Sequence, residues 1–116
     1  MNHMQFLNRV IDNGIAAATK NYTHSQDKKL GAIAGFEACR HKAPDELRAL
    51  LAHAGERREA MRGKSNYWWY RCFEAEVEWV CNVVSAVLLN EGLSPIIQPT
   101  ARGMMAASNI LGIKDR

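Results

Sequence analysis

Basic and aromatic residues gather in one stretch of this chain, Glu56–Arg71, which reads ERREAMRGKSNYWWYR. Arginine, tryptophan and tyrosine side chains dominate the binding energy of many protein interfaces. They can also hold a single-stranded nucleic acid or a nucleotide, because guanidinium groups clamp phosphates while aromatic rings stack on bases. The sequence therefore predicts a partner-binding surface that comprises Arg57, Arg58, Arg62, Lys64, Tyr67, Trp68 and Arg71. A plainer interpretation stays open, in which Trp69 and Tyr70 belong to the core and the arginines are solvated.

Two charged residues fall on helix faces that are otherwise apolar. Arg58 shares a face with Leu51 and Ala54, and Glu76 falls on the apolar arc that includes Phe73. Because an unpaired charge in an apolar interface is costly, we expect Arg58 and Glu76 to form a buried pair between two helices. The alternative is that each long side chain carries its charged end out to solvent.

Residues that could bind a metal or catalyse a reaction are scattered along the chain. The cysteines, Cys39, Cys72 and Cys81, have no CxxC spacing, and the four histidines have neither HExxH nor HxxxH spacing. No serine or cysteine has the sequence surroundings of a known nucleophile. The segment LGAIAGFEA matches no phosphate-binding glycine motif. We therefore expect no catalytic residue, no metal site and no cofactor, and a protein that is not an enzyme.

Length and composition are typical of one globular domain. Of the 116 residues, 47% are hydrophobic and 23% are charged, which differs from the composition of disordered chains. Fifteen Lys and Arg against twelve Asp and Glu leave a formal charge of +3, which is too small to require an acidic partner. The odd number of cysteines favours reduced thiols and a cytoplasmic protein. Neither a secretory signal nor a membrane span is expected.

The hydrophobic periodicity predicts an all-α fold, a compact bundle of about five helices that forms one domain over residues 1–116. Serine and threonine are expected as N-caps, proline in a first turn and glycine just beyond a helix end. The expected helices are 3–20, one that starts at Ser25, Pro44–Gly63, Tyr67–Asn90, and one that starts at Thr100 and stops at Gly112. At 1.5 Å per residue the fourth helix is about 36 Å long.

The fourth helix is the expected centre of the bundle. Its apolar seam, in steps of three and four, is Trp69, Phe73, Val77, Val80, Val84 and Leu88. Flanking apolar residues widen this seam to more than half of the helix circumference. Such a helix is covered either by several helices of its own chain or by a second copy, so a homodimer through this helix stays open.

The second and fifth helices have shorter apolar patterns. For the second we expect an inner face made by Leu30, Ile33, Ala34 and Ala38, with Phe36 on its flank. Gly31 and Gly35 are four residues apart, which favours a face that another helix approaches closely. For the fifth we expect an inner face made by Ala101, Met104, Met105, Ser108 and Leu111.

In size, single helical domain and lack of catalytic signatures, the chain resembles small helical accessory proteins of bacteriophages and prophages, including anti-CRISPR and other counter-defence inhibitors. The resemblance implies stoichiometric inhibition by occupying a host protein or its nucleic-acid site, and it transfers no functional residue. We therefore expect a non-catalytic cytoplasmic protein, encoded by a phage or mobile element, that binds a host protein or protein complex. A nucleic-acid or nucleotide binder that uses the same residues is the alternative.

Overall fold

The protein is all-α, as predicted. The computed structural model describes residues 1–22 and 25–112. Within these ranges the elements are α1 (His3–Asn21), α2 (Gln26–Ala38), α3 (Pro44–Ala60), α4 (Tyr67–Asn90) and α5 (Ala101–Leu111). No strand is formed by these residues, so the expected five-helix architecture is confirmed. None of the described helices combines the length and the apolar character that a membrane crossing needs.

The helix ends agree with most of the predicted capping residues. Thr100 caps α5, because its Oγ1 accepts a hydrogen bond from the N–H of Gly103 at 3.2 Å. Gly112 ends α5 with a φ of 75°, a left-handed conformation that glycine adopts without steric cost. Pro44 lies in the first turn of α3. Ser25 precedes α2 as expected, but its side chain makes no capping hydrogen bond.

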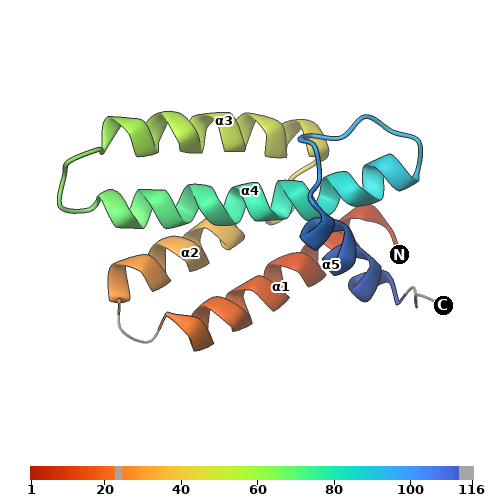
Figure 1. Ribbon diagram of the computed structural model, residues 1–116, viewed down its shortest axis with the longest axis horizontal. Coiled ribbons are helices and arrows are strands. Elements are labelled where there is room, and N and C mark those ends of the chain that lie inside the picture. The colour runs from red at the N-terminus through yellow and green to blue at the C-terminus, as the bar shows by residue number, and fades with distance from the viewer. Residues whose placement is uncertain (23–24, 113–116) are drawn as a thin grey trace.

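α4 lies at the centre of the bundle, with α3 along one side and α1 and α2 along the other (Figure 1). All four other helices pack against it. Val77, Val80 and Val84 of its seam are fully buried. The predicted central helix is confirmed. Because helices of the same chain cover this seam, its burial does not require a second copy of the protein.

α2 packs on α4 through glycines rather than through the expected apolar face. An added Cβ atom at Gly35 would lie 2.5 Å from the carbonyl oxygen of Phe73, and one at Gly31 would clash with the backbone of Trp69. The close approach expected from the spacing of these glycines is therefore confirmed. The expected inner face is wrong in part: Leu30 is 46% exposed, whereas Phe36 is fully buried.

The polar arc of α4 is covered by the segment that leads into α5. The Ser85 hydroxyl accepts hydrogen bonds from the N–H groups of Ile96 and Ile97, at 3.0 and 3.1 Å. The Asn82 side chain accepts from the N–H of Thr100 at 2.9 Å and donates to its hydroxyl at 3.0 Å. Both side chains are buried. These bonds fix where α5 starts on α4.

α5 turns a different face inward from the one we expected. Gly103 and Ala107 are buried, and an added Cβ atom at Gly103 would clash with the amide of Asn82. Met104 and Met105 are 46% and 65% exposed, so their predicted place on the inner face is wrong. Small residues take the inner positions because α5 lies close to α4 at its first turn.

Candidate functional site

The predicted partner-binding residues lie together at one end of the bundle, where α3 ends and α4 begins (the left end of Figure 1). α3 and α4 are antiparallel neighbours joined by residues 61–66, so the last turn of α3 lies beside the first turns of α4. We call these residues the basic-aromatic surface: Arg57, Arg58, Arg62, Lys64, Tyr67, Trp68 and Arg71.

Two arginines contact tyrosine rings at the start of α4: Arg57 lies in the last turn of α3, and Arg62 lies just beyond the end of α3. The guanidinium carbon of Arg57 lies 5.2 Å from the centroid of the Tyr70 ring, and its Nη2 donates to the Tyr70 hydroxyl at 3.3 Å. The guanidinium carbon of Arg62 lies 5.9 Å from the Tyr67 ring centroid. Both distances are within the range of cation–π attraction. The two arginines therefore contact α4 while their side chains stay exposed to solvent.

α2 contributes a cation that the sequence analysis missed. Lys28 Nζ lies 4.6 Å from the centroid of the Trp68 ring. Since these residues are far apart in the chain, their contact depends on the packing of α2 on α4, and no local sequence signal could have revealed it. Trp68 is nevertheless 53% exposed. A large exposed aromatic ring in contact with a cation is a candidate contact point for a partner.

The other aromatic residues here are less exposed than Trp68. Trp69 stacks on Phe73, with ring centroids 5.4 Å apart, and makes an edge contact with Tyr70 at 4.9 Å. All three are partly buried. The plainer interpretation therefore holds in part for Trp69 and Tyr70, which belong to the packing of the bundle, while Trp68 points to solvent.

The expected pair between Arg58 and Glu76 is not formed. Arg58 Nε instead donates to Glu74 Oε1 at 2.5 Å, and the side chains of Arg58 and Glu74 are only 23% and 14% exposed. Glu74 and Glu76 are about 200° apart around α4, so one of them faces α3 and the other faces away. The spacing of residues along α4 places Glu76 on the apolar arc, but it does not indicate which neighbouring helix covers that arc. Glu76 is partly buried on another side of α4.

Acidic residues neutralise part of the positive charge on this surface. Glu59 accepts hydrogen bonds from Arg58 Nη1 at 2.7 Å and from Arg62 Nε at 2.9 Å. The bonds from Arg62 lower the pKa of the Glu59 carboxyl. Arg71 Nη1 lies 4.0 Å from Glu74 Oε1. Three arginines of the basic-aromatic surface therefore belong to a network of mixed charge with Glu59 and Glu74.

The cysteines offer no reactive thiolate at neutral pH. Cys39 and Cys81 are fully buried, and burial raises the pKa of each thiol to about 12. Each thiol donates to a backbone carbonyl, Cys39 to Gly35 at 3.3 Å and Cys81 to Leu47 at 3.7 Å. Within residues 1–22 and 25–112, no three His, Cys, Asp or Glu side chains are close enough to hold a metal ion. The thiols pack as small apolar groups.

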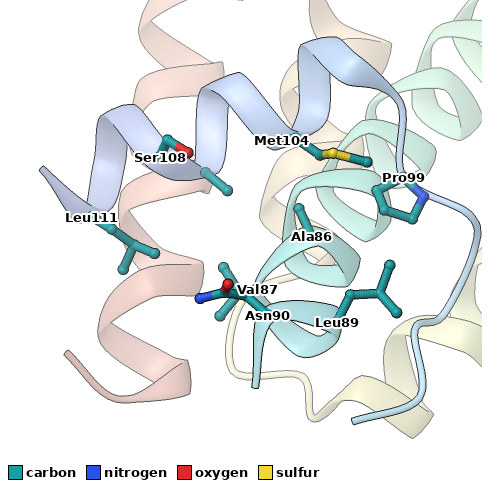
Figure 2. A pocket seen from close by; sticks show the side chains of 9 residues that line it. Ala86, Val87, Leu89, Asn90, Pro99, Met104, Ser108 and Leu111 are labelled. Atoms are coloured by element: carbon teal, nitrogen blue, oxygen red, sulfur yellow. The ribbon is translucent and has the colours of Figure 1, made fainter. Parts of the chain in front are cut away.

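A second surface feature lies between the end of α4 and α5 (Figure 2), as a cavity of about 400 Å³. Leu89, Pro99 and Met104 line it together with the polar side chains of Asn90 and Ser108. This cavity was not expected from the sequence, because the apolar pattern placed Met104 inside the bundle. Its lining contains no titratable side chain, so it offers apolar contact rather than chemistry.

Comparisons of the chain with protein-family models, with curated proteins and with solved structures found no match. Only the fold and the surface therefore characterise the protein. It is an all-α bundle with aromatic rings and cations at the turn between α3 and α4.

Proposed function

We propose that this protein is a non-catalytic binding protein that docks a protein partner on the basic-aromatic surface. The exposure of Trp68 carries the proposal. Its ring is 53% exposed although Lys28 lies against it, so the fold holds the ring in place without burying it. Tyr67 makes an edge contact with this ring at 5.5 Å and is itself contacted by Arg62. Tryptophan, tyrosine and arginine are the residue types that dominate binding hot spots.

The mixed charge of the surface favours a protein over a nucleic acid as the partner. Glu59 and Glu74 lie among the arginines and accept hydrogen bonds from them. Carboxylates at these positions would repel a phosphate backbone, whereas a protein interface can pair both signs of charge. In keeping with the resemblance to phage counter-defence proteins, we propose that the partner is a host protein. This protein would inhibit the host protein by binding to it and occupying its surface.

A nucleic-acid or nucleotide binder is the second candidate, and the exposed cations favour it. Arg62 and Arg71 have side chains that are 62% and 48% exposed, and Lys64 is exposed between them in the chain. Together with Trp68 they could hold phosphates and stack on a base. Binding by phosphate contacts weakens steeply with salt, whereas binding through a protein hot spot depends little on salt.

Affinity purification of the tagged full-length protein from its host, with and without nuclease, tests the proposal. We expect a companion protein that survives nuclease, whose binding to the purified protein is lost in Trp68→Ala and Arg62→Ala. The matched controls are Met105→Ala, at an exposed apolar residue of α5, and Arg9→Ala, at an exposed residue of α1. Equal binding by all four variants would overturn the assignment of the surface, and loss of every companion after nuclease would favour the second candidate.

A further inference from the structure

A cavity of about 550 Å³ lies where α1, α2, α4 and α5 meet, and none of its lining residues belongs to the basic-aromatic surface. Its walls include the aromatic side chains of Tyr22, Phe36 and Trp79. Gly14 of α1 also lines it, and its backbone packs so closely on the Phe36 ring that a side chain at Gly14 would clash with the ring. The largely apolar and aromatic lining is typical of sites for small organic ligands.

One carboxylate, Glu76, lines this cavity. No ion pair or hydrogen bond joins Glu76 to another residue among those the structure describes, although it is partly buried. Burial raises the pKa of its carboxyl from 4.5 to about 7. A desolvated carboxylate without a partner is unfavourable unless a cation joins it.

None of the described side chains around Glu76 places a cation on its carboxylate. Tyr22 and Cys72 are its titratable neighbours, and burial, followed by the proximity of Cys72 and Glu76, raises the pKa of the Tyr22 hydroxyl. Arg102 of α5 lines the same cavity, yet its guanidinium forms no ion pair with Glu76. Asn21 adds an amide at the edge. The cavity therefore presents the Glu76 carboxylate beside the rings of Tyr22 and Trp79, with the Arg102 guanidinium elsewhere in the lining and not paired with it.

We propose that this cavity binds a small alkylammonium ion, with its charged head on the Glu76 carboxylate and its alkyl chain against the partly exposed rings of Tyr22 and Trp79. Aromatic rings attract an ammonium group through their negative faces and also bury its methylene groups. A divalent metal ion is a poorer fit, because calcium or magnesium takes six or more oxygen ligands and the lining offers a single carboxylate.

The probe for this proposal is n-butylammonium, with n-butanol as its neutral counterpart, titrated into the full chain by amide NMR at pH 8. We expect n-butylammonium to shift the signals of Gly14 and Glu76, and n-butanol to bind at least about tenfold more weakly. Because the ligand stays charged while Glu76 is protonated, binding at pH 5.5 should also be about tenfold or more weaker than at pH 8.

Glu76→Gln is the decisive variant, and Glu78→Gln is its matched control, since Glu78 is an exposed residue on the same helix. Glu76→Gln should lose at least about tenfold in affinity and Glu78→Gln should keep it. Arg102→Gln should bind the probe more tightly, because a like charge has been removed from the lining. Equal affinity in Glu76→Gln, equal binding of n-butanol, weaker binding in Arg102→Gln, or no response to n-butylammonium would each overturn the proposal.

Discussion

Gly35 of α2 lies against the carbonyl of Phe73 in α4, so closely that a Cβ atom on Gly35 would lie 2.5 Å from that oxygen. Alanine usually stabilises a helix by about 1 kcal/mol relative to glycine. Here the added methyl group must push two backbones apart, so we expect Gly35→Ala to lower the free energy of unfolding by about 2 kcal/mol. Urea denaturation followed by circular dichroism measures this change.

Gly55→Ala in α3 is the control for this substitution. A Cβ atom at Gly55 would meet the end of the flexible Glu74 side chain, 2.8 Å from its Oε2, and no backbone atom. We expect a change of less than about 1 kcal/mol, because the carboxylate can move aside. If Gly35→Ala were as stable as the unmodified protein, the close contact of α2 with α4 would be wrong.

Ser85→Ala should destabilise the protein by about 2 kcal/mol. The Ser85 hydroxyl accepts from the backbone N–H groups of Ile96 and Ile97, and its loss leaves two partly buried donors without an acceptor. Thermal unfolding by calorimetry measures the effect. Ser94→Ala, at an exposed residue of the same connection, should change the unfolding free energy by less than about 0.5 kcal/mol. Equal stability of the two variants would contradict the role of Ser85.

Glu76 should make the protein less stable as pH rises. The folded-state pKa of Glu76 is raised from 4.5 to about 7, so the folded protein binds this proton more tightly than the unfolded chain does. The free energy of unfolding contributed by Glu76 therefore falls as pH rises from about 4.5 to about 7, and it is constant beyond these limits.

Glu76→Gln removes this pH dependence and should stabilise the protein by about 1 kcal/mol at pH 8, a value reduced for the partial exposure of the carboxylate. Denaturation curves of both proteins between pH 4.5 and pH 8 measure the difference. A difference in stability that does not change over this interval would show that the Glu76 carboxyl titrates at its ordinary pKa.

The thiols of Cys39 and Cys81 should react with an aromatic disulfide reagent only as fast as the protein unfolds. Both are fully buried, and burial raises the pKa of each to about 12, so the native state holds almost no accessible thiolate. Mass spectrometry of labelled peptides at increasing urea concentrations measures the rates. Fast labelling of either thiol in the native protein would contradict the packing around it.

Local signals were enough to place the helices. Pro44 and Thr100 start α3 and α5, and Gly112 stops α5 with a positive φ, because capping and steric preferences involve neighbours in the chain. The buried side of α4 was also predicted correctly from Val77 to Leu88, since apolar residues at steps of three and four point in one direction.

The inner faces of α2 and α5 were less predictable. The apolar pattern of α2 placed Leu30 on the inner face and Phe36 only on its flank. Packing on α4 selected the side that carries Gly31 and Gly35. On α5, the apolar pattern placed Met104 on the inner face. Gly103 instead packs against Asn82 of α4, and Met104 is therefore exposed.

The sequence by itself determined that this protein is a bundle with a long apolar central helix, and that its cations and aromatic rings gather between the third and fourth helices. Those properties follow from periodicity and neighbouring residues. Only the tertiary structure decided that Arg58 pairs with Glu74, that Lys28 holds Trp68, and that Glu76 faces a cavity. The reason is that a helix pattern gives the direction of a side chain but not the helix that it meets.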